Sequence, residues 1–172
     1  MARTPDEVGG PFADAEMTRF LDTYFYDRTA FLIDEVRRID AEANEVEAVM
    51  DTTRHLPYGS LQRGNPALHP RHVSGPELVM VTANLGSLHA YFVHGCRWDA
   101  GWVGYGNRIH RADFKRLARV GPPVVLHSRE VRSRLGPARL VSRYLFRFEQ
   151  EGEVVYQAEQ TAQFLKGLRP EA

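Results

Sequence analysis

Apolar residues recur at spacings of three and four between Leu78 and Phe92, which is the period of an α-helix. No charged residue interrupts this stretch, so we expect the helix to be buried on most sides. The residues from Ser74 to Glu77 match a capping box with a proline beside it, a pattern typical of a helix start. The pattern therefore predicts a long central helix over residues 77–93.

Alternating apolar and polar residues predict strands on both sides of this helix. Before it, residues 14–26 have the pattern of a short amphipathic helix, and residues 31–36 and 46–51 that of a strand pair. After it come a glycine-rich aromatic strand with bulges at residues 98–108 and long strands at residues 124–134, 139–149 and 153–166. This order predicts a disordered segment at residues 1–13 and one α+β domain at residues 14–172, with a bent antiparallel sheet around the central helix.

Charge is balanced, with 22 Lys and Arg against 22 Asp and Glu among 172 residues. This balance argues against a nucleic-acid partner or a membrane-surface role. The basic residues are nevertheless crowded between Arg97 and Arg147, where they form solvated strand faces or attract a phosphate-bearing partner. The N-terminus lacks the layout of a secretory signal and no apolar run reaches membrane-spanning length, so we expect a cytoplasmic protein.

Candidate chemistry gathers in the loop over residues 52–75, which is rich in glycine and proline and contains His69 and His72 near its end. The start of a helix offers unpaired N–H groups and partial positive charge, which can stabilise an oxyanion beside a histidine base. Cys96 is the only cysteine, and we interpret it as a buried structural thiol. His89 is expected to be a hydrogen-bonded core residue. No spacing suits a metal site, so neither a metal nor a cofactor is expected.

Three stretches, Phe31–Asp34, His69–Val81 and Ile109–Pro122, resemble motifs of the hotdog fold of acyl-thioester enzymes. The first and third look like parts of the FabZ/FabA hydroxyacyl-carrier dehydratases, and the second like their histidine loop and central helix. The resemblance covers roughly residues 31–166. It implies a single hotdog domain that forms a homodimer, with an acyl chain in a tunnel beside the central helix. The implied substrate is an acyl-CoA or an acyl-carrier-protein thioester.

The histidine loop resembles the FcoT-type thioesterases more specifically. These carry a loop histidine, a glutamate five residues later and then a polar residue in the apolar run, and His72 and Glu77 keep the first spacing. Thr82 and Asn84 flank the position of the polar residue, and Tyr58 is the nearest match to the family's loop tyrosine. The resemblance implies that the catalytic residues are His72, Thr82, Asn84 and Tyr58, and that Ser74, Gly75 and Glu77 contact the substrate.

Some FcoT-type relatives from polyketide and isonitrile lipopeptide pathways add glycine to an α,β-unsaturated acyl thioester and then hydrolyse it. By this resemblance the product would be an N-carboxymethyl-β-amino acid, with His72 as the base and Arg54 holding the glycine carboxylate. One alternative is a 3-hydroxyacyl-carrier dehydratase, although Thr82 stands where a dehydratase needs a carboxylate. A second alternative is a non-catalytic acyl-binding domain.

Overall fold

The computed structural model describes residues 10, 14–65 and 67–167 of the chain. The two α-helices are α1 (Ala15–Thr23) and α2 (Gly75–Leu88), and the short helical turns are η1 (Arg28–Ala30), η2 (Gly59–Leu61), η3 (His89–Val93) and η4 (Trp98–Ala100). The strands are β1 (Glu35–Asp40), β2 (Glu45–Met50), β3 (His72–Val73), β4 (Trp102–Phe114), β5 (Ala118–Arg119), β6 (Val124–Leu135), β7 (Arg139–Gln150) and β8 (Glu153–Lys166). The segment predicted to be disordered, residues 1–13, lies outside the described residues except for Gly10.

One antiparallel sheet contains six strands in the order β1-β2-β6-β7-β8-β4. The predicted strands after the helix are confirmed, and the one predicted at residues 98–108 instead runs from Trp102 to Phe114, with the bulges that its glycines indicated. β3 and β5 form a separate two-stranded ladder beside the start of α2. β4 has 13 residues and lies at the edge of the sheet, so one of its sides has no strand partner among the described residues.

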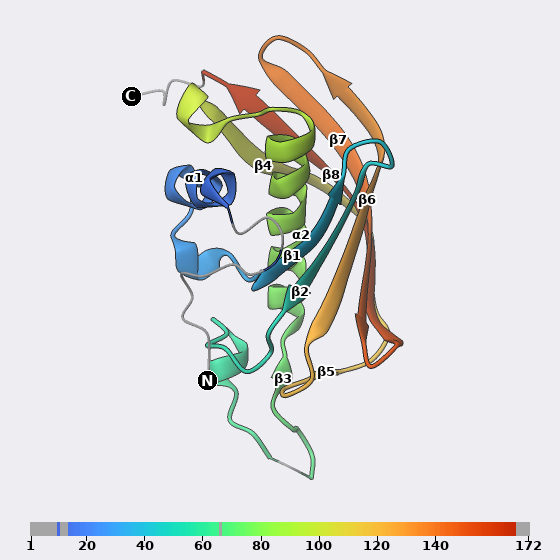
Figure 1. The fold of residues 1–172 in the computed structure, drawn as a ribbon. Helices are drawn as coiled ribbons and strands as arrows, with labels where there is room; N and C mark the ends of the chain where they lie inside the picture. Colours follow the sequence, from blue (N-terminus) through green and yellow to red (C-terminus); the bar gives the residue numbers. More distant parts are fainter. Residues whose placement is uncertain (1–9, 11–13, 66, 168–172) are drawn as a thin grey trace, which may run out of the picture.

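The central helix α2 lies between the sheet and α1 (Figure 1). Leu78, Val81, Leu85 and Leu88 are at most 2% exposed, because they follow the helical period and face the packed interior. Ser74 is the N-cap, Gly75 begins the helix, and a proline follows in the first turn. The predicted buried central helix is therefore confirmed, with a π-helical turn, η3, continuing it to Val93.

The strand predicted at residues 31–36 is wrong in its position. β1 begins only at Glu35, and Phe31, Leu32 and Ile33 precede it as an extended segment that belongs to no strand. All three side chains are at most 2% exposed, whereas a strand in a sheet turns alternate side chains to opposite faces. A continuous apolar run was therefore mistaken for a strand, although it fills the space beside α1 and α2.

The N-terminal helix α1 covers the side of α2 that faces away from the sheet (Figure 1). Its N-cap is Asp14, whose carboxylate accepts hydrogen bonds from the N–H groups of Glu16 and Met17 at 3.0 Å. Phe20 is fully buried and its ring lies 5.9 Å from the ring of Trp98. The predicted helix is thus confirmed, although it ends at Thr23 rather than at residue 26.

Buried polar side chains gather where α2 passes into η3. His89 is fully buried, and its Nε2 lies 2.9 Å from Ser128 Oγ, which confirms the predicted hydrogen-bonded core histidine. His94 Nε2 lies 2.7 Å from Glu130 Oε2, a pair that the sequence did not indicate. Burial opposes ionisation of Glu130, yet the hydrogen bond with His94 holds the pKa of this carboxyl below its usual value. Cys96 is buried, as expected.

Burial lowers the pKa of His89 from 6.5 to about 4, so the folded protein keeps this imidazole neutral where an unfolded chain would protonate it. The unfolded state therefore binds more protons between pH 6.5 and 4, and stability falls as the pH drops through this window. We expect His89 to account for a loss of about 3 kcal/mol, at 1.36 kcal/mol per pKa unit. Denaturant titrations of wild type and His89→Gln at several pH values should show a smaller loss in the variant. Parallel pH profiles would contradict this assignment.

Among the described residues, no helix is long and apolar enough to cross a membrane.

Candidate active site

Glu77 is fully buried and connects the start of α2 to the preceding loop by hydrogen bonds. Its Oε1 accepts hydrogen bonds from the backbone N–H groups of Tyr58, at 2.8 Å, and Gly59, at 2.7 Å. Its Oε2 accepts from the N–H of Ser74 at 2.7 Å. A Cβ at Gly59 would lie 3.1 Å from Glu77 Oε2, so glycine permits this close approach. Glu77 thus positions the loop against the helix and has its carboxylate fully engaged.

His72 lies in β3, three residues before the first residue of α2. Its Nδ1 is 2.9 Å from the carbonyl oxygen of Pro70, and a carbonyl can only accept a hydrogen bond. The neutral imidazole therefore carries its proton on Nδ1 and presents an unprotonated Nε2, the form that a general base needs. The ring of His69 lies 5.0 Å from the ring of His72. His72 is therefore a candidate base in the segment that leads directly into α2.

The N-terminus of α2 offers the second component of a reactive site. Gly75 is the first helical residue, and the first N–H groups of a helix have no partner within it. Gly75 is half-buried, and a Cβ on it would lie 3.1 Å from the ring of Phe114. The hydroxyl oxygen of Ser74 is buried and has no hydrogen-bond partner among the described residues. The N–H of Gly75 and the positive end of α2 therefore follow His72 closely in the chain.

Thr82 and Asn84 lie deeper along α2 and differ in what they contact. The Thr82 hydroxyl lies 2.6 Å from the carbonyl of Val79 and 2.9 Å from Gln160 Oε1. Asn84 Oδ1 accepts from the N–H of Leu32 at 3.0 Å, and its amide nitrogen donates to the carbonyl of Ala30 at 3.3 Å. The Asn84 amide thus connects the segment before β1 to the helix by hydrogen bonds, and both ends of the amide are engaged there.

Two residues that the resemblance placed in the site have other contacts. Arg54 forms an ion pair with Asp34 at 2.9 Å, and the two side chains are only 8% and 13% exposed. Burial raises the pKa of Asp34, although the Arg54 guanidinium counteracts this effect. Tyr58 is 54% exposed, and its backbone N–H, not its side chain, binds Glu77. The Arg54 guanidinium is therefore already paired, and the roles expected of Arg54 and Tyr58 stay predictions.

An apolar cavity of about 90 Å³ lies beside the middle of α2. Its residues come from α2, the chain after α1, and β4, β7 and β8: Tyr24, Phe25, Tyr26, Thr82, Ala83, Gly86, Ser87, Gly104, Tyr105, Gly106, Tyr144, Phe146, Gln160, Thr161, Ala162 and Phe164. Glycines at 86, 104 and 106 leave room between the helix and the strands. His72 is not among the lining residues, so the base lies toward one end of α2 and the cavity along its middle.

Sequence reasoning missed the aromatic and glycine residues that line this cavity. The signal available was the Gly104-Tyr105-Gly106 triplet, because two small residues on one face of a strand leave space against a helix. Gln160, the partner of Thr82, had no local signal in the sequence. It lies 78 residues from Thr82, and the packing of β8 against α2 brings the two side chains together. Within the described part of the chain, no group of His, Cys, Asp and Glu has the arrangement of a metal site.

No protein-family model matches this chain, and no curated protein matches it either. Solved structures do. A mutant of thioesterase PA1618 from Pseudomonas aeruginosa has 20% sequence identity and a TM-score of 0.53, over 81% of this chain and 85% of that one. A hypothetical thioesterase with coenzyme A from Streptococcus pneumoniae has 16% identity and a TM-score of 0.54, over 86% of this chain and 97% of that one.

A third structure, the dehydratase heterocomplex ApeI:P from Xenorhabdus doucetiae, has 12% identity and a TM-score of 0.64, over 89% of this chain and 91% of that one. At sequence identities this low, the similarity shows a shared fold and not a shared function, because one fold hosts many functions. The shared arrangement is the one described above, a long helix packed against a large antiparallel sheet with a short N-terminal helix. The chain therefore has a single hotdog fold.

Proposed function

We propose that the protein hydrolyses acyl thioesters of coenzyme A or an acyl carrier protein. The observation that carries the proposal is the contact of His72 Nδ1 with the Pro70 carbonyl, which leaves Nε2 as the acceptor of the neutral ring, three residues before α2 begins. Nε2 takes a proton from water, the water oxygen attacks the thioester carbonyl, and the oxyanion is stabilised by the N–H of Gly75 and the positive end of α2. The carbon–sulfur bond then breaks, the thiol leaves with the proton, and the free acid remains. Two of the similar structures carry the name thioesterase.

The acyl chain is proposed to occupy the cavity beside α2. Apolar and aromatic walls favour a hydrocarbon chain, because burial of its surface is the main term in binding. Gly86 lines this cavity, and a Cβ there would lie 3.5 Å from the ring of Tyr144, an ordinary contact. The side chain at position 86 is therefore expected to limit the acyl length.

Gly86→Leu is expected to fill the cavity and shift the preference toward shorter acyl chains. We expect a loss of about tenfold or more in kcat/KM for the longest chain accepted, the scale of one or two methylene groups in an apolar pocket. Gly86→Ala is the matched control, since its extra methyl group makes only ordinary contacts. Rates on a series of acyl-CoA lengths provide the measurement. An unchanged length profile in Gly86→Leu would remove the cavity from the acyl site.

The protein is proposed to act as a homodimer joined along β4. This strand presents an unpaired edge and the exposed apolar side chains of Tyr105, Ile109 and Phe114, which are 47%, 52% and 56% exposed. A long edge strand with exposed apolar side chains invites pairing with another strand. A second copy that adds its own β4 here would continue the sheet and cover the surface near Gly75, because Phe114 contacts that glycine.

Glycine addition is the finer reading, in which hydrolysis follows conjugate addition to a 2-enoyl thioester. His72 would serve as the base for the amine, but the guanidinium proposed for the glycine carboxylate, on Arg54, is already paired with Asp34. Dehydration is the other reading. It lacks a carboxylate at Thr82, and the carboxylate of Glu77 is occupied by three backbone N–H groups. The structure therefore favours plain hydrolysis over both.

One experiment distinguishes these readings. The protein is incubated with a 2-enoyl-CoA, with and without glycine, and with the saturated acyl-CoA, while released thiol and product masses are followed. Free acid and free coenzyme A in both incubations are the expected products. A glycine adduct would establish the addition, and a hydrated thioester with no thiol release would establish the dehydratase. Saturable binding without any product would identify a non-catalytic acyl-binding domain and overturn the proposal.

A further inference from the structure

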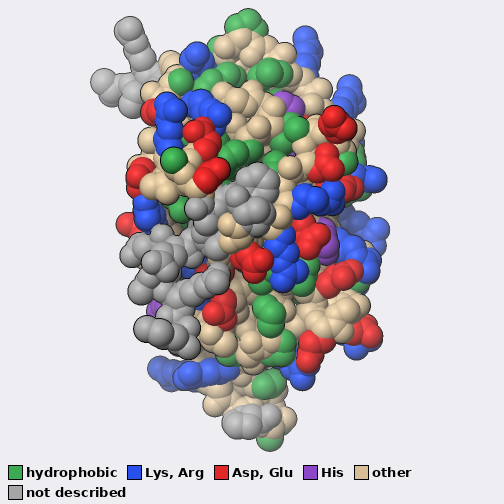
Figure 2. Space-filling view, viewed as in Figure 1, with side chains coloured by type: hydrophobic (Ala, Val, Ile, Leu, Met, Phe, Trp, Pro, Cys, Tyr) green, Lys and Arg blue, Asp and Glu red, His purple; other side chains and the backbone are tan. Residues whose placement is uncertain are grey.

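The outer face of the sheet carries a cleft of about 600 Å³ at the β6–β7 hairpin, which we call the arginine cleft. Its polar side chains include His110, Arg132, Arg134, Arg139, Arg143 and Thr161, and no carboxylate is among its lining residues. In the space-filling view, basic side chains project along the margin occupied by the sheet (Figure 2). Four of the twelve Lys and Arg residues between Arg97 and Arg147 line this cleft.

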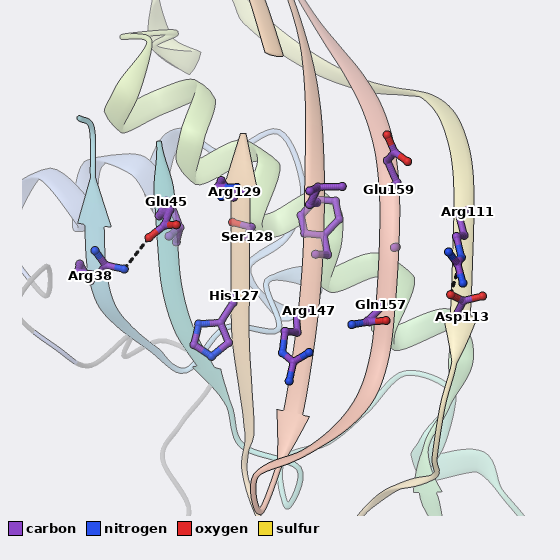
Figure 3. A pocket seen from close by; sticks show the side chains of 14 residues that line it. Arg38, Glu45, Arg111, Asp113, His127, Ser128, Arg129, Arg147, Gln157 and Glu159 are labelled. Atoms are coloured by element: carbon purple, nitrogen blue, oxygen red, sulfur yellow. Dashed lines mark hydrogen bonds and ion pairs between the residues drawn. The ribbon is translucent and has the colours of Figure 1, made fainter. Parts of the chain in front are cut away.

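A second cleft on the same face, of about 450 Å³, provides an internal comparison (Figure 3). Its arginines are mostly neutralised by neighbouring carboxylates. Arg38 pairs with Glu45 at 2.9 Å, Arg111 pairs with Asp113 at 2.6 Å, and Arg147 pairs with Glu149. Ion pairs of this kind are usual on a solvated strand face. In the arginine cleft only Arg143 has such a partner among the described residues, so the two clefts differ in charge although they lie on one sheet.

A β-bulge in β6 turns two arginines into the cleft. Up to Glu130, the even-numbered residues of β6 face inward and are buried. The register shifts between Glu130 and Arg132, so that Arg132 lies opposite the outward-facing Arg143 and Arg134 lies opposite Val141. Without this extra residue both arginines would point toward α2. Bulges of this kind re-aim side chains next to functional sites.

The arginines of the cleft are short of negative partners. Arg132 lies directly across from Arg143, and like charges in that position destabilise a sheet. Arg132 and Arg134 form no hydrogen bond or ion pair with any described residue, and Arg139 donates only to the neutral side chain of Gln163. Arg143 pairs with Glu159, yet its Nε is buried without an acceptor. A bound anion would supply what the chain does not.

We propose that the arginine cleft binds an organic bisphosphate, such as a nucleotide that carries two phosphate groups. Guanidinium groups match phosphate oxygens with paired hydrogen bonds, and several of them favour several phosphates. The hydroxyl of Thr161, which bonds His110 Nε2 at 2.7 Å, adds a neutral polar group to the wall. The hollow is of the size that small ligands occupy. A helix of a partner protein would need a longer surface than this cleft provides.

The test is calorimetric titration of the full chain with adenosine 3′,5′-bisphosphate at low salt. Saturable binding that weakens as salt is added is expected, because screening reduces the attraction of exposed charges. The double variant Arg132→Gln/Arg134→Gln should bind at least tenfold more weakly. The matched control is Arg38→Gln/Arg147→Gln, which removes the same charge from the paired cleft and should bind as the wild type does.

A second measurement keeps the result interpretable if a variant folds poorly. The bisphosphate should raise the unfolding temperature of the wild type and of the control, and leave that of the Arg132→Gln/Arg134→Gln variant unchanged. Without ligand, that variant should be at least as stable as the wild type, because it loses a repulsion between opposed arginines. Equal binding by both double variants, or no saturable binding by the wild type, would overturn the proposal, as would binding of an acidic carrier protein alone.

Three further ligands distinguish the source of the phosphates. Coenzyme A and free adenosine 3′,5′-bisphosphate should both bind if the nucleotide is what the cleft recognises, whereas dephospho-coenzyme A and AMP should bind more weakly. Binding is independent of the acyl site. Hydrolysis of a thioester of N-acetylcysteamine, which has no phosphate, should therefore be equal in wild type and Arg132→Gln/Arg134→Gln. A loss of that activity in the folded variant would argue against a separate phosphate site.

Discussion

Replacing His72 with alanine is expected to lower kcat for acyl-thioester hydrolysis by roughly 10²–10⁴-fold, the usual contribution of a general base. The reason is the fixed tautomer, because the Pro70 carbonyl holds the proton on Nδ1 and leaves Nε2 free to accept one. Alanine removes this acceptor and places no substitute beside the first turn of α2. Initial rates of thiol release at saturating acyl-CoA provide the measurement.

The ring of His69, 5.0 Å from that of His72, makes His69→Ala the matched control. This control removes a neighbouring imidazole from the same loop and should retain most of the activity. KM should change little in His72→Ala, because the acyl chain is bound by the apolar cavity. A kcat for His72→Ala within a few fold of wild type would refute the assigned role of His72.

Glu77→Ala is expected to have the largest effect on stability among single changes in this region. Its carboxylate accepts three backbone N–H groups, and alanine would leave the N–H groups of Tyr58, Gly59 and Ser74 without this acceptor. Unsatisfied buried donors cost about 1–3 kcal/mol each, so we expect a loss of roughly 3–5 kcal/mol in the free energy of unfolding. Denaturant unfolding followed by circular dichroism measures it.

Glu77→Gln separates the hydrogen bonds from the size of the side chain. Its remaining amide oxygen can still accept from Tyr58 and Gly59, while the amide nitrogen meets the Ser74 N–H, a second donor. The loss should therefore be intermediate between wild type and Glu77→Ala. A Glu77→Ala protein as stable as the wild type would show that water satisfies these groups and that Glu77 does not fasten the loop.

The element order could be predicted because each element carries its own period. α2 combines a helical period with a start signal, β7 alternates over all of its 12 residues, and β6 alternates up to Glu130. The strand predicted over the segment from Phe31 to Ile33 was wrong because this segment is a continuous apolar run, which has no period. Its conformation depends on contacts with α1 and with Asn84, which local pattern does not show.

The candidate site was predictable only where its residues lie close in the sequence. His72, Ser74 and Glu77 fall within six residues, so a motif could bring them together. Arg54 was expected to bind the carboxylate of glycine, whereas its partner in the structure is Asp34, 20 residues away. The pair of His94 with Glu130 spans 36 residues and joins a helix end to a strand. Such partners are set by strand register, which single side chains do not reveal.

The position of β4 in the sheet has a consequence for how the chain folds. β4 pairs only with β8, which is made last of all the strands, so both edges of β4 stay open while β6 and β7 are synthesised. Its exposed residues Tyr105 and Ile109 are then available to any other strand. A nascent chain released before Glu153 would lack β8, so both edges of β4 and its apolar side chains would stay exposed. Aggregation of truncated or slowly translated chains should therefore begin at β4.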